Sequence, residues 1–153
     1  MCVIKKETAT MEELNNIHVS AYFNLVKTAA WIEEEIKAAL KPSGLTHAQL
    51  NVLYILNDMD PDPVSPSILK EQIIVSQPDI TRLIDRLVNK GLVNREICPE
   101  NRRKIDITLT ERGREVFQNA HEAARRFVTR NIQNKFSSDE ASELRRMMHL
   151  IRE

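Results

Sequence analysis

The chain has 153 residues, of which 42% are hydrophobic and 5% aromatic, and it contains only 3 glycines. This length suits one domain with an apolar core, and the composition disfavours a β-sandwich or a doubly wound sheet. The formal net charge is +0, so overall charge gives no sign of a nucleic-acid-binding protein. The composition therefore predicts a mostly α-helical protein in which local charge placement must reveal any DNA-binding surface.

Several function classes are disfavoured by motifs that the sequence lacks. It has no apolar run of signal-peptide or membrane-spanning length, so we expect a cytoplasmic protein without a membrane partner. Cys2 and Cys98 lie far apart and the 4 histidines stand singly, which predicts no disulfide framework, metal site or cofactor. GxSxG, HExxH and phosphate-binding glycine motifs are missing, so we expect no enzyme and no catalytic residues.

The first predicted element is a long amphipathic helix over residues 12–40, preceded by a loose arm at residues 1–10. Its apolar positions recur in steps of three and four residues: Leu14, His18, Ala21, Leu25, Thr28, Ile32, Ile36 and Leu40. The segment Pro42-Ser43-Gly44 ends this helix, and Thr46 with Gln49 has the capping-box pattern that starts a second one. The apolar residues of the second helix are Leu50, Leu53, Tyr54 and Leu56.

Two short helices are predicted next. Asp60-Pro61-Asp62-Pro63 forms a loop, and Ser65 with Pro66 begins a helix that runs to about Ile74. Ser76 is predicted to cap the following helix, with Pro78 in its first turn, where proline is tolerated. The apolar face of that helix consists of Ile80, Leu83, Ile84, Leu87 and Val88, which leaves its opposite face polar.

A β-hairpin and two further helices complete the prediction. Gly91 ends the preceding helix, after which residues 93–98 and 104–109 each alternate between apolar and polar side chains. Thr110 begins a long helix, and a second capping box at Ser137 and Glu140 begins the last one. Two short helices followed by a hairpin form a winged helix-turn-helix, in which the second short helix reads DNA.

The predicted DNA-binding residues fall into two groups. The recognition helix offers Ser76, Gln77, Pro78, Thr81, Arg82 and Arg86, where arginine suits guanine, glutamine suits adenine, and hydroxyls suit phosphates. The wing offers Arg95, Asn101, Arg102, Arg103 and Lys104, whose adjacent cations suit a phosphate backbone or a narrow minor groove. An alternative explanation for the helix is that Arg82 forms ion pairs with Asp79 and Asp85 on a solvated face.

These motifs carry a family resemblance: Leu45-Thr46 with Gln49 and Leu53, Val75-Ser76-Gln77-Pro78, Thr81-Arg82-Leu83-Ile84-Asp85-Arg86-Leu87, Lys90-Gly91-Leu92-Val93-Asn94-Arg95, Asn101-Arg102-Arg103 and Leu109-Thr110-Glu111-Arg112-Gly113. The chain resembles MarR-type transcriptional regulators, the multiple antibiotic resistance regulator family. The resemblance implies a single domain over 1–153, with a winged helix-turn-helix lobe at 45–113 and dimerisation helices at 11–40 and 114–153. It also implies a homodimeric, ligand-responsive repressor that binds a pseudo-palindromic operator in double-stranded DNA.

The apolar stripes of the long helices independently favour a dimer. We expect Phe117, Phe127, Phe136, Met147 and Met148 to need cover from a second subunit. The alternative is a monomer whose helices fold onto themselves.

The chain departs from the family pattern in the wing. Cys98 stands where relatives commonly have an acidic residue, and Asn101 stands where they have aspartate. Asparagine keeps the turn but removes a carboxylate that would orient Arg102 or Arg103.

Many relatives are released from DNA by small aromatic acids, and the resemblance implies an effector crevice between the dimerisation helices and the DNA-binding lobe. Tyr22, Trp31, His47 and Tyr54 lie on segments suited to line it, although each is also explained as ordinary core. A different class of function also stays open, namely a winged-helix protein-interaction module that lacks specific DNA binding.

Overall fold

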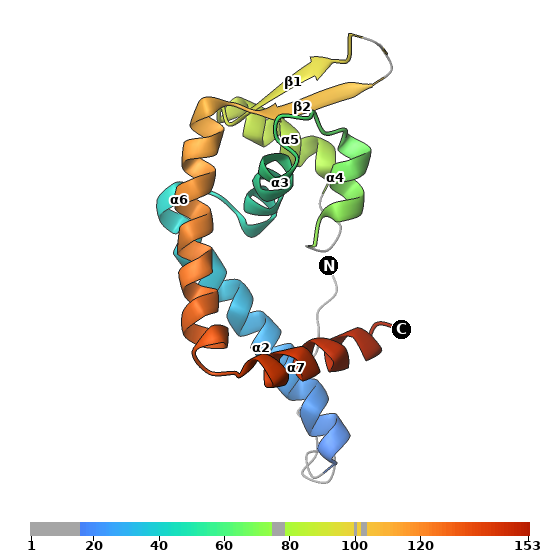
Figure 1. Ribbon diagram of the computed structural model, residues 1–153, viewed down its shortest axis with the longest axis vertical. Coiled ribbons are helices and arrows are strands. Elements are labelled where there is room, and N and C mark those ends of the chain that lie inside the picture. The colour runs from blue at the N-terminus through green and yellow to red at the C-terminus, as the bar shows by residue number, and fades with distance from the viewer. Residues whose placement is uncertain (1–15, 75–78, 100, 102–103) are drawn as a thin grey trace, which may run out of the picture. The chain divides into compact units, whose positions relative to one another are not determined.

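The protein is described by a computed structural model that covers residues 16–74, 79–99, 101 and 104–153. The chain divides into two units, residues 1–35 and residues 36–153. Its described elements, shown in Figure 1, are α2 (Ile17–Leu40), the 3-10 turn η1 (Lys41–Ser43), α3 (His47–Asp58), α4 (Pro66–Gln72), α5 (Ile80–Asn89), β1 (Val93–Ile97), β2 (Ile105–Leu109), α6 (Glu111–Val128), the π-helical turn η2 (Thr129–Gln133) and α7 (Ser138–Leu150). Helices dominate, which confirms the predicted mostly α class with one hairpin. None of the described helices is long and apolar enough to cross a membrane.

The described part of the first unit is one helical segment that carries large exposed apolar side chains. The predicted long helix is confirmed from Ile17 onward, and its predicted start at residues 12–15 lies outside the described residues. Within residues 16–35, Ile17, Tyr22, Val26 and Trp31 are all exposed. The buried positions of α2 are Ile36 and Leu40, which belong to the second unit. Several large apolar side chains of residues 16–35 are therefore exposed to solvent in the single chain.

The predicted end of α2 and start of α3 are both confirmed. Gly44 adopts a left-handed conformation with φ of 63° after η1, a conformation that favours glycine. Thr46 Oγ1 accepts a hydrogen bond from Gln49 N at 3.2 Å, and Gln49 Oε1 accepts one from Thr46 N at 3.1 Å. Lys90 Nζ also donates to Gln49 Oε1, at 3.1 Å, and thereby ties the C-terminal end of α5 to the start of α3.

The core of the second unit is centred on α3, which contributes five of its apolar side chains. Figure 1 shows α3 between α6 and the pair formed by α4 and α5, all of which it contacts. Side chains from four elements are fully or almost fully buried there: Leu53, Leu69, Ile84, Leu87 and Ile107. Burying side chains of this size stabilises the fold by roughly 1.5–3 kcal/mol each. Helices α4 and α5 are thereby held against α3 as the two short helices of a helix-turn-helix.

The predicted hairpin is confirmed, and backbone hydrogen bonds also attach it to the loop that precedes α4. Strands β1 and β2 pair antiparallel, with Val93 opposite Leu109 and Ile97 opposite Ile105. Val64, in the loop between α3 and α4, exchanges two backbone hydrogen bonds of 3.0 Å with Ile107. Both residues are fully buried. The base of the hairpin is therefore fixed to the helix-turn-helix.

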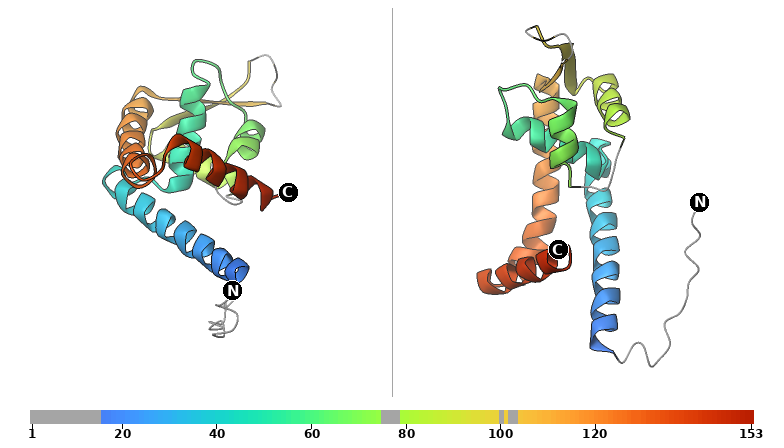
Figure 2. Two further views of the ribbon diagram at one scale, coloured as in Figure 1. Left: turned by 60° about the horizontal axis from the view of Figure 1, so that its bottom comes forward. Right: turned by 90° about the vertical axis from the view of Figure 1, so that its right-hand side faces the viewer.

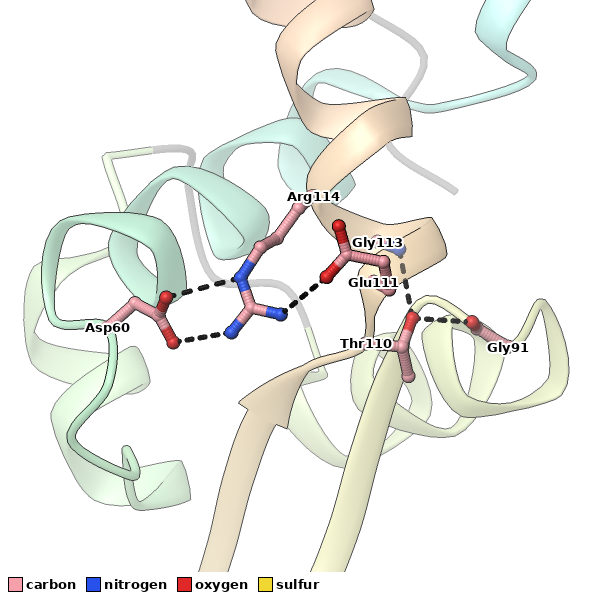
Figure 3. A network of polar contacts seen from close by, with 6 residues as sticks. All are labelled: Asp60, Gly91, Thr110, Glu111, Gly113 and Arg114. Carbon is pink, nitrogen blue, oxygen red and sulfur yellow. Dashed lines mark hydrogen bonds and ion pairs between the residues drawn. The ribbon is translucent and has the colours of Figure 1, made fainter.

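A polar network fixes the start of α6 (Figure 3). Thr110 caps this helix as predicted, because its hydroxyl accepts from Gly113 N at 2.9 Å, and it also donates to Gly91 O at 2.8 Å. Arg114 donates to both carboxylate oxygens of Asp60, at 3.2 and 2.8 Å, and this carboxylate raises the pKa of the guanidinium. The network joins α6 to the end of α5 and to the loop after α3.

The C-terminal helices confirm one prediction and correct another. The capping box of α7 is present, with Glu140 N donating to Ser137 Oγ at 3.3 Å and Ser137 N donating to Glu140 at 2.9 Å. The prediction that Phe117 and Phe127 need a second subunit is wrong, because both are buried within the chain. They share the inward stripe of α6 with Ala120.

Two other residues expected to need cover are exposed. Phe136 and Met147 are exposed, Met148 is half-buried, and α7, whose backbone is drawn in two further views in Figure 2, has no buried residue.

Gly113 offers a test of how α6 meets the helix-turn-helix. A Cβ atom at this position would overlap the carbonyl oxygen of Leu92. We expect Gly113→Ala to lower the free energy of unfolding by about 1–3 kcal/mol or more, because the backbone at Leu92 or at Gly113 must move to make room. This loss should occur even though alanine favours helices more than glycine does. Urea denaturation of the purified protein measures this change.

Gly44→Ala is the matched control, because a Cβ there meets open space. Gly44→Ala should lower the free energy of unfolding only by the strain of alanine in a left-handed conformation, about 1–2 kcal/mol. A Gly113→Ala variant as stable as the wild type would contradict the close approach seen in the structure.

Candidate DNA interface

The helix expected to enter DNA begins later than its sequence indicated. Its N-cap is Asp79, whose Oδ1 accepts from Arg82 N at 3.1 Å, so the predicted cap at Ser76 is wrong. Aspartate is among the strongest N-caps, and its carboxylate also suits the positive end of the helix dipole. The predicted contacts Ser76, Gln77 and Pro78 lie outside the described residues. Because α5 begins at Ile80, the prediction that its first turn contains residue 78 is wrong.

One face of α5 packs on the core and the other carries the predicted DNA-binding residues. Leu83, Ile84 and Leu87 are buried, whereas Val88, predicted as buried, is 36% exposed. Val88 lies at the margin of the apolar arc, where solvent reaches it. The exposed polar side chains of α5 are Thr81, Arg82, Asp85, Arg86 and Asn89. The structure therefore brings Thr81, Arg82 and Arg86 onto one accessible helix surface.

Two ion pairs organise this surface. Arg82 Nε lies 3.2 Å from Asp79 Oδ2, which confirms the predicted pair between these residues. Asp85 pairs with Arg95 Nη1 of β1 at 2.8 Å, and not with Arg82 as the alternative explanation also expected. Arg95 was predicted as a DNA contact, and the structure shows that it also joins the wing to α5. Both pairs are exposed, so each stabilises the fold by only about 0–1 kcal/mol.

The wing closes in a hydrogen-bonded turn that presents polar residues. Cys98 N donates to Lys104 O at 3.0 Å, and Lys104 N donates to Asn101 O at 2.8 Å. Asn101 and Lys104 are exposed. The predicted wing residues Arg102 and Arg103 lie outside the described residues. Exposed polar groups thus continue from α5 through Arg95 to the hairpin turn.

Asp79 and Asp85 were not among the predicted DNA-binding residues, because the sequence named them only as possible ion-pair partners of Arg82. In the structure each holds one arginine of this surface, Asp79 holding Arg82 at 3.2 Å and Asp85 holding Arg95 at 2.8 Å. The three-residue spacing of Asp79 and Arg82 already indicated the first pair, since such residues face each other on a helix. The pairing of Asp85 with Arg95 had no such signal, because the two lie on different elements.

The alternative explanation required the candidate effector residues to be buried in the core, and the structure does not place them there. Tyr22 and Trp31 are 61% and 45% exposed in the first unit, and Tyr54 is 48% exposed in the second. Tyr54 meets His121 edge to face, with ring centroids 5.7 Å apart. His47 is half-buried at the first position of α3. Three of the four aromatic candidates therefore remain accessible in the single chain.

A groove of about 330 Å³ lies elsewhere in the second unit. It is lined by Ala39, Pro42, Ser43, Val116, Asn119, Ala120 and Ala123, and by none of the four effector candidates. Its lining has no charged side chain. Among the described ranges, no three His, Cys, Asp or Glu side chains gather to hold a metal ion.

Comparison with known proteins identifies the fold. The MarR family model matches residues 45–105, which span the helix-turn-helix and most of the hairpin. A MarR transcription factor from Planctomyces limnophilus is 32% identical, and the match covers 86% of this chain and 94% of that one with a TM-score of 0.66.

Two more distant structures share the fold. A cysteine variant of MarR from E. coli, complexed with operator DNA, is 22% identical over 94% of this chain and 99% of that one, with a TM-score of 0.72. An organohalide-sensing transcriptional regulator in a 2,4-dichlorophenol-bound form is 18% identical over 99% of this chain and 88% of that one, with a TM-score of 0.78. The winged helix-turn-helix, the exposed arginines of α5 and the likeness to the Planctomyces protein together show that this chain belongs to the MarR family of transcription regulators.

Proposed function

We propose that this chain is a sequence-specific DNA-binding repressor that acts as a homodimer and responds to a small aromatic effector. The observation that carries the proposal is the exposed face of α5, where Arg82 and Arg86 stand beside a wing that Asp85 and Arg95 join to the same helix. A helix with such a face fits the major groove, while the adjacent hairpin reaches the backbone and minor groove. The related E. coli protein was seen with operator DNA, which supports this use of the fold.

Each group of side chains has a separate role in the proposal. Thr81, Arg82 and Arg86 address base edges and nearby phosphates, together with Ser76, Gln77 and Pro78 just before the helix. The wing residues Arg95, Asn101, Arg102, Arg103 and Lys104 bind the backbone and minor groove, where sequence information is low and positive charge is favoured. Base contacts give the specificity, and wing contacts give most of the salt-sensitive affinity.

Dimerisation sets the spacing between the two copies of α5 that enter the DNA. We assign residues 45–113 to the DNA-binding lobe and residues 11–40 and 114–153 to dimerisation. The exposed apolar side chains on α2 and at the C-terminal end support this division, because water-exposed surface of that kind favours a second subunit. Two copies related by a twofold axis bind half-sites about one helical turn apart. A bound effector that changes this spacing releases the operator, and transcription resumes.

The wing offers the first test of DNA binding. Replacing Arg102 and Arg103 with alanine should weaken binding to a selected operator on the order of tenfold, and reduce the salt slope by up to about 2, because two phosphate contacts are lost. Fluorescence anisotropy with a labelled duplex at several salt concentrations measures both quantities. Arg125 and Arg126, also adjacent in sequence, pair with Glu122 on α6 and supply the matched alanine control, and light scattering checks that this variant keeps the wild-type mass.

Three outcomes separate the proposals. Loss in the wing variant alone supports the wing assignment. Equal binding by both variants contradicts that assignment. If the wild type binds no duplex in preference to a shuffled one, the protein-interaction module becomes the better explanation.

Dimerisation is tested at an exposed apolar residue of α7. Light scattering of the wild type should give about twice the monomer mass of 17.7 kDa. Leu150→Asp should shift the protein toward monomer, because it places a charge on an apolar surface that a second subunit would cover. Ile97→Asp is the control, since Ile97 is similarly exposed but lies on the wing. A monomeric wild type would contradict the proposal.

Effector binding is tested with benzoate and 2,4-dichlorophenol as probes. A ligand that binds the folded protein raises its melting temperature, by an amount that grows with ligand concentration. We expect at least one probe to raise the melting temperature and to release the labelled operator at the same concentrations. Tyr54→Ala should reduce both effects if Tyr54 lines the effector site. An unchanged melting temperature with both probes would favour a repressor that does not respond to aromatic ligands.

A further inference from the structure

We propose that Asp79 is a specificity-determining residue that positions the guanidinium of Arg82 for bidentate reading of a guanine in the operator half-site. This inference rests on the proposed function, because it requires α5 to enter the major groove. It adds an acidic residue to a surface in which only basic and neutral side chains were expected to act. The argument depends on which nitrogen atoms of Arg82 the carboxylate occupies.

The Asp79 carboxylate contacts Arg82 at two atoms. Oδ1 accepts from the backbone N of Arg82 at 3.1 Å, and Oδ2 lies 3.2 Å from Arg82 Nε. The carboxylate therefore fixes both the first turn of α5 and the direction of the arginine side chain. A long side chain that is already ordered loses less conformational entropy when it binds.

The engagement of Nε leaves the far end of Arg82 available. The Arg82 side chain is 79% exposed, and no described residue accepts a hydrogen bond from its Nη1 or Nη2 atoms. Bidentate recognition of guanine uses two donors of the rigid guanidinium fork, directed at O6 and N7. Arg82 presents such a pair of terminal donors, already oriented and free of the ion pair.

Arg95, the other arginine held by an aspartate, does not keep both terminal nitrogens free of its ion pair. Arg95 gives its terminal Nη1 to Asp85 at 2.8 Å, and its side chain is only 35% exposed. One end of its fork is therefore already used, so Arg95 suits a positioning or phosphate-binding role. The two arginines are held by the same chemistry, but Arg82 is held through Nε and keeps both terminal nitrogens, whereas Arg95 is held through one of its terminal nitrogens.

Asp79 also affects what lies next to that guanine. Its side chain is 55% exposed, and its negative charge at the N-terminus of α5 disfavours a phosphate there. A carboxylate accepts from the amino group of cytosine, and it is repelled by base edges that carry only acceptors. The base beside the guanine should therefore present an amino group to Asp79.

The experiment compares base preferences, not only affinity. A randomised duplex library is selected with the full-length wild type, and the dissociation constant is then measured for each single-base change in the half-site. We expect one guanine whose replacement weakens wild-type binding by about tenfold to a hundredfold, as is typical of a bidentate pair.

The central variant is Asp79→Asn. Asparagine caps helices as well as aspartate does, so the fold and α5 should persist, which thermal melting checks. When its oxygen caps Arg82 N, however, its amide group meets Nε as donor against donor. We expect the preference for guanine at that position to fall to about threefold or less, since the fork is no longer held.

Two further variants complete the design. Arg82→Lys keeps the charge but lacks the fork, so it should lose the same preference while binding of unselected DNA and its salt slope stay nearly unchanged. Glu111→Gln is the matched control, because Glu111 is an exposed acid that pairs with Arg114 at the same three-residue spacing on another helix. Its base preferences should equal those of the wild type.

The outcomes distinguish this inference from the proposed function. A wild type that selects no sequence would overturn both. Selection by the wild type with an undiminished guanine preference in Asp79→Asn would overturn only the role of Asp79, leaving it as a helix cap. Unchanged preferences in Arg82→Lys would overturn the assignment of Arg82 to a guanine.

Discussion

The contact between the first turn of α6 and the Leu92 carbonyl is the constraint on which the winged helix-turn-helix depends. Leu92 O accepts from Thr110 N at 3.1 Å, and Gly113 lies so close to this oxygen that no side chain fits between them. The Thr110 hydroxyl meanwhile joins Gly91 to Gly113. Because Gly91 follows the C-cap of α5, the end of α5 and the start of the longest helix of the second unit are held as one junction.

This junction explains how a hairpin with little core of its own is held in place. Most of β1 is exposed, and only Val93 in that strand is buried. A two-stranded hairpin is marginally stable alone, so it needs other attachments. Val64 pairs with β2 from the helix-turn-helix side, and Thr110 anchors the end of β2 to α6. The hairpin is therefore positioned at its base by contacts with the helices.

The zero net charge of the chain is compatible with DNA binding, because some basic side chains are used in internal contacts and others face solvent beside α5. Lys90 is used internally, where it donates to Gln49 and to Gly44 O. Arg114 is held by Asp60 at the junction. On α5, by contrast, acidic residues orient arginines that still reach solvent. A count of basic residues alone cannot distinguish these roles, because the role depends on the partner of each cation.

Local patterns in the sequence determined the secondary structure, since capping, turn and periodicity signals act within a few residues. The Thr46, Thr110 and Ser137 caps and the turns at Gly44 and Gly91 were all predicted correctly. The start of α5 was misplaced because two strong cap residues, Ser76 and Asp79, stand close together and propensity alone does not rank them.

Only the tertiary structure decided which partner each charged or apolar side chain finds. It turned Phe117 and Phe127 inward, left Tyr54 accessible, and paired Asp85 with Arg95 across two elements. Such contacts depend on how separate elements pack, which short-range sequence patterns do not encode. The sequence by itself thus determined the elements and the family resemblance, whereas packing decided how the arginines of α5 and β1 are held.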